Sequence, residues 1–327
     1  MLSLALHKSL HPNLSFFKLL TKNSSFSINI SLLSPFKASK SFQYSQSSPK
    51  FTFTTTKYKE ASRENTKLVD LEKLKKKYGE NHPAIVSYFS KLGTDYDIMD
   101  NHGEAIKCYQ KAININIELY GEKDQQVADF YLKKGLSYFY AGDNESALHC
   151  YNKALETFQE IEECDEINLG ICYDKIGSVY YYVGNFGKGL TYYEKARDIY
   201  EKKYNENHPD ILELYNQMGI AYDEMKNYNE SAKSWEKVVK IKEVLLGKKN
   251  QSIAESYYKL GMALVNKNDF FHAEESLQKA FPLLKKTLGE KSEEVFNCIE
   301  CLGISQFHLK DYDKAIESLE KVQSLIK

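Results

Sequence analysis

A glycine recurs every 42 residues through most of this chain, without a single insertion or deletion. The glycines of this series are Gly93, Gly135, Gly177, Gly219, Gly261 and Gly303. A period held this strictly is typical of a solenoid, in which each repeat is one supersecondary unit that stacks on its neighbours. The question of function therefore becomes the question of what binds the stacked surface.

Two apolar stripes in each repeat predict two helices per unit. A bulky apolar residue precedes the glycine in five of the six repeats, and a tyrosine follows the glycine by three residues in four of the six. Farther along, small residues stand 12 and 19 positions after the glycine, and an aromatic residue or leucine stands at 16. Glycine inside a helix costs roughly 0.5–1 kcal/mol relative to alanine. We therefore expect each glycine to mark a close approach of the paired helix, where a methyl group would clash.

This pattern resembles the tetratricopeptide repeat, whose usual unit is 34 residues long. The longer unit found here, with loops at 78–83 and 204–209 that both end in Asn-His-Pro, looks like the kinesin light chain type. The resemblance covers about residues 78 to 327. It implies an all-α fold, a right-handed superhelical solenoid of antiparallel helix pairs, in which the first helix of each pair lines the concave face.

The chain divides into three segments. Residues 78–327 hold six repeats of 42 residues, and residues 60–77 are predicted to form an N-terminal capping helix. Pro282 falls inside the second helix of the fifth repeat, and it is expected to bend or end that helix near Phe281. The sequence stops inside the second helix of the sixth repeat. We expect its last face to be polar or to be covered by another protein subunit.

Residues 1–59 differ in composition from the repeats. They contain eight lysines, many serines and no acidic residue, which leaves 36 basic against 45 acidic residues from Glu60 onward, a formal charge of −9. A cationic, acid-free leader predicts a mitochondrial transit peptide, with a plastid-type destination or an uncleaved disordered arm as the open alternatives. The sequence shows neither the uninterrupted apolar core of a secretory signal nor a membrane span.

The sequence predicts no metal site, no cofactor and no catalytic activity. Cys298 and Cys301 form a CxxC, but no second cysteine pair or histidine cluster follows to complete a set of four ligands. His82 and His208 belong to the repeated Asn-His-Pro loop, where we expect them to cap and turn the chain. Motifs for phosphate binding or nucleophilic catalysis are missing. The acidic repeats also argue against a nucleic acid partner.

A protein or peptide is the class of partner that these exclusions leave. The binding residues are therefore predicted from the positions on the exposed side of the first helices. At 100° per residue, the positions two before and five after each glycine lie opposite the packed side. The first series reads Lys91, Lys133, Lys175, Gln217, Lys259 and Cys301, and the second reads Ile98, Tyr140, Tyr182, Glu224, Asn266 and His308.

Two kinds of binding site follow from these series. The lysines Lys91, Lys133, Lys175 and Lys259 could hold an acidic peptide or a C-terminal carboxylate, although Asp129 and Glu255 stand four residues before two of them and could pair with them. Tyr140 and Tyr182 form an exposed aromatic pair, which is a preferred anchor at protein interfaces.

We therefore predict a non-catalytic protein-interaction scaffold, an accessory or assembly component of a mitochondrial complex. The first alternative is a cytosolic cargo- or peptide-binding adaptor resembling kinesin light chain repeats. The second is an enzyme or regulator that uses the CxxC, which would show bound zinc or a reactive thiol pair.

Overall fold

The described part of the chain is entirely helical. The structure is a computed structural model that describes residues 71–248 and 250–326, so the predicted leader at 1–59 lies outside the described residues. Its α-helices and one 3₁₀ helix are α3 (Leu71–Tyr78), α4 (Pro83–Ile98), α5 (His102–Tyr120), α6 (Gln125–Tyr140), α7 (Asn144–Glu160), α8 (Glu166–Tyr182), α9 (Phe186–Lys203), α10 (Pro209–Glu224), α11 (Tyr228–Leu246), η2 (Gln251–Ile253), α12 (Ala254–Asn266), α13 (Phe270–Leu288), α14 (Glu293–His308) and α15 (Tyr312–Ile326).

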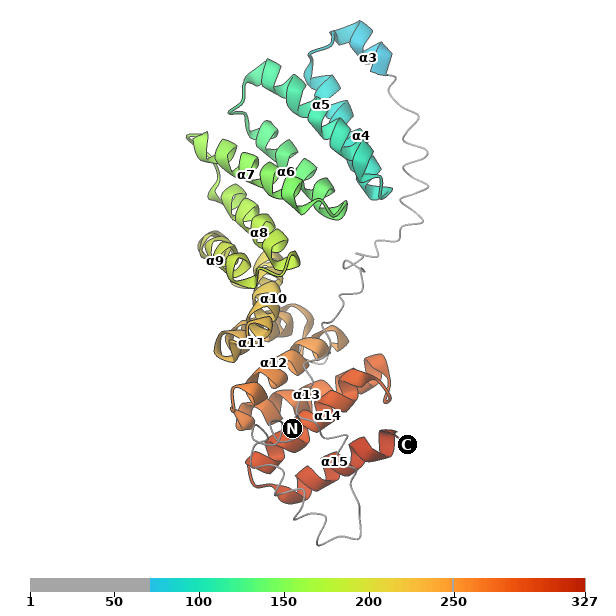
Figure 1. The fold of residues 1–327 in the computed structure, drawn as a ribbon, viewed down its shortest axis with the longest axis vertical. Coiled ribbons are helices and arrows are strands. Elements are labelled where there is room, and N and C mark those ends of the chain that lie inside the picture. The colour runs from blue at the N-terminus through green and yellow to red at the C-terminus, as the bar shows by residue number, and fades with distance from the viewer. Residues whose placement is uncertain (1–70, 249, 327) are drawn as a thin grey trace, which may run out of the picture. The chain divides into compact units, whose positions relative to one another are not determined.

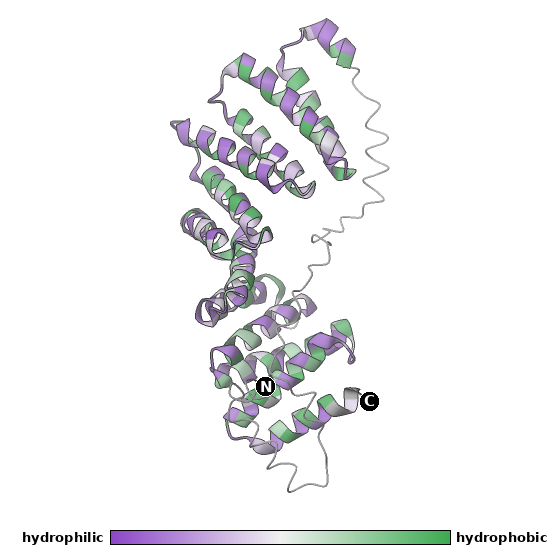
Figure 2. Cartoon of the chain, in the orientation of Figure 1, coloured by the Kyte–Doolittle hydropathy of each residue, from purple (hydrophilic) through white to green (hydrophobic). Residues whose placement is uncertain are grey.

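Each repeat folds as one helix pair, from α4 and α5 in the first repeat to α14 and α15 in the sixth. Every helix packs against the next one along the chain, as Figure 1 shows. In Figure 2 hydrophobic and hydrophilic residues alternate along the helices, as expected when each helix buries one face and exposes the other. The predicted fold class, an all-α solenoid of antiparallel helix pairs, is confirmed.

The recurrent glycines lie where the two helices of a pair come closest. A Cβ atom on Gly135 would stand 2.6 Å from Cε1 of Tyr151, and one on Gly261 would stand 2.5 Å from Cγ of Leu277. The contact is looser only in the sixth repeat, where a Cβ atom on Gly303 would stand 3.2 Å from the side chain of Leu319. The expected close approach is confirmed, and its partner is the bulky residue 16 positions after each glycine.

Two of the first helices, α4 and α10, are capped by histidines. His82 Nδ1 accepts a hydrogen bond of 3.1 Å from the backbone N–H of Ala84 at the start of α4, and its ring stacks on Tyr78. The same arrangement recurs at α10, where His208 Nδ1 accepts from the N–H of Asp210 at 3.2 Å. In both helices the residue after the histidine is a proline at the first position. These histidines cap helices, as predicted from the sequence.

Pro282 does not end its helix. α13 continues past it to Leu288, so of the two expected effects, a bend or an end near Phe281, the end does not occur. A proline inside a helix removes the hydrogen bond to the carbonyl four residues earlier, which belongs to Gln278. Both Pro282 and Gln278 are exposed, so water can hydrate the carbonyl that has lost its donor.

The described part of the predicted capping segment is the short helix α3. Leu71 and Leu74 pack against the buried cluster of the first repeat, which contains Ile85, Val86 and Phe89. Residues 60–70 lie outside the described residues. α3 therefore covers apolar surface of α4 that the first repeat would otherwise expose.

Candidate protein-binding surface

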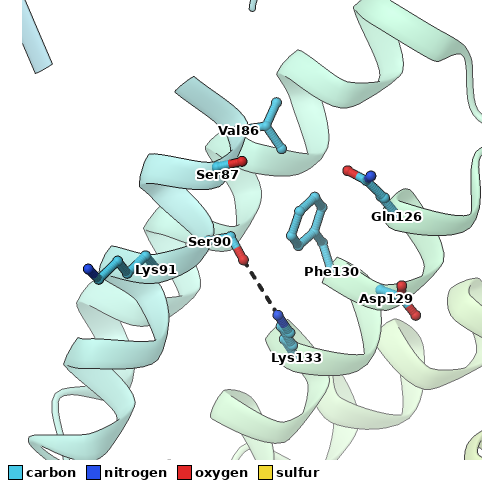
Figure 3. Close-up of a pocket in the computed structure, with 8 residues that line it drawn as sticks. All are labelled: Val86, Ser87, Ser90, Lys91, Gln126, Asp129, Phe130 and Lys133. Atoms are coloured by element: carbon cyan, nitrogen blue, oxygen red, sulfur yellow. Dashed lines mark hydrogen bonds between the residues drawn. The ribbon is translucent and has the colours of Figure 1, made fainter. Parts of the chain in front are cut away.

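Two of the predicted lysines line a groove between the first helices of repeats one and two. Lys91 on α4 and Lys133 on α6 are both exposed, and Figure 3 shows them on the two helices that border this groove. The groove has a volume of about 360 Å³, and its other lining residues are Val86, Ser87, Ser90, Gln126, Asp129 and Phe130. Its wall is thus polar for most of its extent, with two cations and one carboxylate.

A smaller groove of about 120 Å³ follows between α6 and α8. Its lining residues are Leu132, Lys133, Leu136, Tyr151, Ile171 and Lys175. Lys133 belongs to both grooves, so three of the predicted lysines form one continuous series over three repeats. The fourth, Lys259, is only partly exposed and lines neither groove.

The charges of these lysines are neutralised less than the sequence suggested. Lys133 Nζ reaches across the groove and donates to Ser90 Oγ at 3.4 Å, drawn as the dashed line in Figure 3. Neither expected intrahelical ion pair, of Lys133 with Asp129 or of Lys259 with Glu255, is among the ion pairs within 4 Å in residues 71–248 and 250–326. Burial raises the pKa of Asp129, although the charge of Lys133 opposes that shift.

Lys175 is the lysine of the series that does carry an ion pair. Its Nζ lies 2.9 Å from the carboxylate of its neighbour Asp174, which raises the pKa of Lys175 and keeps it protonated. Tyr140, an exposed residue of repeat two, lies within electrostatic reach of this lysine of repeat three. Of the three lysines that line the grooves, Lys91 and Lys133 therefore remain available to an anionic partner.

The aromatic residues predicted for this face are exposed. Tyr140 is 54% exposed and Tyr182 is 50% exposed. The ring of Phe139 links them, because its centroid lies 6.0 Å from that of Tyr140 and 4.8 Å from that of Tyr182. In repeat one, Ile98 occupies the corresponding position and is 41% exposed. An apolar strip thus runs along the C-terminal ends of α4, α6 and α8.

The lysines and the apolar side chains coincide only in the first three repeats. There each first helix presents a lysine and, seven residues later, a large apolar residue, and we call this set the lysine–apolar surface: Lys91, Ile98, Lys133, Tyr140, Lys175 and Tyr182. The fourth repeat has Gln217 and Glu224 at these positions, and the fifth has Lys259 and Asn266. Helical spacing predicted both series, and the residues at these positions show that a lysine and a large apolar residue coincide in three repeats only.

In the sixth repeat the two positions no longer form a surface. Cys301 is buried in one apolar cluster with Tyr258, at the point where α12 and α14 pack against each other. His308 stacks on Phe270 with ring centroids 4.0 Å apart, and partial burial lowers its pKa. The prediction that Cys301 lies on the exposed side of its helix is therefore wrong, because neighbouring first helices close the face there.

An unforeseen hydrogen-bond network fixes the helices beneath the surface. The carboxylate of Asp97, beside Ile98, accepts from His102 Nδ1 at 2.9 Å, from Tyr109 Oη at 3.1 Å and from Ser137 Oγ at 2.8 Å. These donors lie on α5 and α6, so one carboxylate ties three helices together. The aspartate stands four residues after the repeat glycine, a position that only the fourth repeat shares, as Asp223. Asp223 likewise accepts from Trp235 Nε1 at 2.9 Å.

The CxxC does not form a reactive pair. Cys298 and Cys301 are both buried, and burial raises the pKa of each thiol to about 12. Groups of histidine, cysteine and carboxylate residues that could hold a metal ion are not found within the described ranges. The two cysteines occupy packing positions in the core of repeats five and six.

Alkylation of the native protein tests this assignment. At pH 8, iodoacetamide is expected to modify the partly exposed Cys164 long before Cys298 or Cys301, because a thiol with a pKa near 12 is ionised in roughly one molecule in ten thousand. Mass spectrometry of the alkylated peptides measures the order, and the same reaction in denaturant, where all six cysteines should react, is the control. Rapid labelling of Cys298 and Cys301 in the native protein would contradict the assignment.

No helix within residues 71–248 and 250–326 combines the length and the apolar character that crossing a bilayer requires. This finding concerns those ranges alone.

Comparisons with known proteins agree with the geometry of the repeats. Family models described as tetratricopeptide repeat match residues 84–160, 126–188, 171–243, 253–294 and 302–325, which together make up more than half of the chain. No curated protein matches the sequence.

Several solved structures share the fold. The C-terminal part of a TPR repeat-containing protein from Cytophaga hutchinsonii is 19% identical, covers 84% of this chain and 93% of its own, and gives a TM-score of 0.57. A STAND signal-transduction ATPase with a tetratricopeptide repeat sensor from Pyrococcus horikoshii is 18% identical, with 82% of this chain and 38% of that one covered and a TM-score of 0.59. Repeats of a putative kinesin light chain from Podosopora anserina are 17% identical, with 63% and 98% covered and a TM-score of 0.54. At these identities the likeness concerns the fold alone.

Proposed function

Because the chain belongs to the tetratricopeptide repeat family, we propose that it is a non-catalytic interaction scaffold that binds a protein partner through the lysine–apolar surface of repeats one to three. Repeats of this family generally act as interaction modules. The observation that carries the proposal is the coincidence, in three successive repeats, of a lysine and an exposed apolar side chain on the same helix face.

The chemistry of this surface suits a protein partner. Tyrosine supplies a large contact area with few rotatable bonds, and exposed aromatic side chains are enriched among residues that dominate binding energy. The lysines beside them provide charge that steers a partner and fixes its register. The grooves between α4, α6 and α8 offer recesses into which side chains of the partner can insert.

We further propose that the scaffold is an accessory or assembly component of a mitochondrial multiprotein complex. The support is compositional: residues 1–59 carry eight lysines and no acidic residue, ahead of repeats with a negative formal charge. Mass spectrometry of the protein purified from fractionated cells tests this proposal. Loss of a segment ending before about Glu60 in the mitochondrial fraction is the expected result, and an intact Met1 in the cytosol would contradict it.

A cytosolic cargo adaptor is the second candidate. It is favoured by the 42-residue period and by the similarity of fold to the putative kinesin light chain repeats. The same fractionation separates the two candidates, since an adaptor of this kind would stay in the cytosol with its N-terminus uncleaved. Both candidates use the repeats to bind protein, so the proposed surface does not depend on the compartment.

A further inference from the structure

We propose that the segment of the partner that occupies the lysine–apolar surface is an amphipathic α-helix, with acidic residues on one flank and apolar residues on the other. This inference rests on the proposed function, because it specifies the chemistry of a partner that the scaffold is proposed to bind. Three properties of the surface support it: the separation of the two rows of side chains, their repeat along the surface and their charge.

The separation of the two rows matches the width of a helix. On each first helix the lysine and the apolar residue are seven positions apart, for example Lys133 and Tyr140 on α6. Seven residues of helix rise by about 10 Å, and a helix with its side chains is about 10–12 Å wide. A helix that crosses α4, α6 and α8 can therefore face the lysines with one flank and the apolar residues with the other.

The repeat along the surface also fits a helix better than an extended segment. Side chains of α4 and α6 meet across the larger groove, where Lys133 Nζ lies 3.4 Å from Ser90 Oγ. Neighbouring helices in contact are about 10 Å apart, so equivalent side chains on successive first helices are expected to recur about every 10 Å. In a helix, residues seven apart are separated by this distance and lie on the same face. In a strand about three residues span it, and every second contact would then point to the opposite side. An acidic residue in every seventh position thus meets successive lysines.

The charge of the surface differs in sign from that of the chain around it. Residues from Glu60 onward carry a formal charge of −9, whereas Lys91 and Lys133 are exposed and have no ion pair in the described part of the chain. The nearby carboxylates include Asp174, which pairs with Lys175, and Asp129, on the groove wall. Asp97, beside Ile98, accepts hydrogen bonds from three side chains, and Asp210 acts on Lys175. An acidic helix is therefore attracted by these lysines and repelled by the acidic surface elsewhere.

The surface ends at the fourth repeat, which limits the length of the helix. There Gln217 replaces the lysine, and Glu224 replaces the apolar residue and would face the apolar flank of the partner with a charge. Three repeats correspond to about three heptads, or about 21 residues of helix. The occupant is therefore a short helical segment.

A synthetic helix tests the inference on the full-length protein. The probe is a fluorescein-labelled, hydrocarbon-stapled peptide of about 21 residues, with glutamate at every seventh position on one flank and phenylalanine on the other. Fluorescence anisotropy should show saturable binding. The double substitution Lys91→Gln with Lys133→Gln should weaken it about tenfold at low salt, since each exposed ion pair contributes only a few-fold. Lys259→Gln, at the same position of a repeat outside the surface, should leave it unchanged.

Two further peptide probes refine the test. One shows whether the bound peptide must be helical rather than extended, and the other shows whether its negative charge is required for binding. A peptide with the same sequence except for a central proline should bind at least tenfold more weakly. A stapled peptide with glutamine in place of glutamate should also bind at least tenfold more weakly. Equal binding of the proline peptide would overturn the helix and favour an extended partner. If the Lys91→Gln, Lys133→Gln variant binds the stapled peptide as tightly as the unsubstituted protein, the helix does not bind at the lysine–apolar surface.

The failure of this inference can be told apart from failure of the proposed function. If the natural partner protects this surface from modification but the stapled probe does not bind, the scaffold role stands and the acidic helix is rejected. If the natural partner binds equally well when the surface residues are substituted, the proposed binding surface itself is rejected.

Discussion

Replacing Gly135 by alanine is expected to destabilise the repeats by about 3 kcal/mol, the upper end of the usual range for overpacking a core. The added Cβ atom would stand 2.6 Å from Cε1 of Tyr151, a side chain that is only 1% exposed. Gly261→Ala should act similarly, because its Cβ atom would stand 2.5 Å from Cγ of Leu277. Urea unfolding followed by far-ultraviolet circular dichroism measures the loss.

The chain provides matched controls for these substitutions. A Cβ atom on Gly103 or Gly187, near the starts of α5 and α9, would meet nothing within 4 Å, so alanine there should be neutral or stabilise by up to about 1 kcal/mol. Gly303→Ala should cost less than Gly135→Ala, since its nearest contact is 3.2 Å. If Gly135→Ala unfolds at the same urea concentration as Gly103→Ala, close helix approach is not the reason for the regular spacing of glycines within this chain.

The double substitution Tyr140→Ala with Tyr182→Ala is expected to weaken binding of the natural partner at least thirtyfold, equivalent to about 2 kcal/mol. Both rings are about half exposed, so their removal should leave the helical content unchanged. Titration of the purified partner by calorimetry measures the affinity, and circular dichroism checks the fold.

Tyr120→Ala is the matched control for the tyrosine pair. Tyr120 is 55% exposed, similar to Tyr140, but it ends α5, the second helix of its repeat, and lies outside the lysine–apolar surface. Its removal should not change the affinity. Unchanged affinity of the double variant, or an equal loss in Tyr120→Ala, would remove these tyrosines from the binding site.

The period of the sequence was sufficient to predict the fold. Gly135 and Tyr151 belong to two series with a fixed offset, so the pairing of the helices follows from the sequence alone. The Asn-His-Pro loops also predicted correctly where α4 and α10 begin. These features are local or strictly periodic, and a sequence displays both directly.

Features that depend on the distance between helices could not be predicted in this way. Cys301 has the same place in its repeat as Lys91, yet it is buried because α12 and α14 pack together. Lys133 could have paired with Asp129, but it reaches Ser90 on the neighbouring helix instead. Helical spacing identifies which side chains can meet within one helix, whereas the packing of different helices decides which do.

The grooves illustrate the same limit at the candidate site. Ser87, Ser90 and Gln126 line the larger groove, although none of them belongs to the two series that the sequence singled out. Ser90 stands one residue before Lys91, on the side of α4 that faces the next repeat. Its place in the repeat is plain in the sequence, but only the position of α6 beside α4 makes Ser90 border a recess.

Hydroxyl-radical footprinting of the full-length protein, alone and in complex with its natural partner, tests the central claim most directly. Tyr140, Tyr182 and Tyr120 are similarly exposed in the described structure, so all three should be oxidised in the free protein. The account predicts that Tyr140 and Tyr182 become protected in the complex while Tyr120 does not. Unchanged oxidation of Tyr140 and Tyr182 in the saturated complex would contradict it.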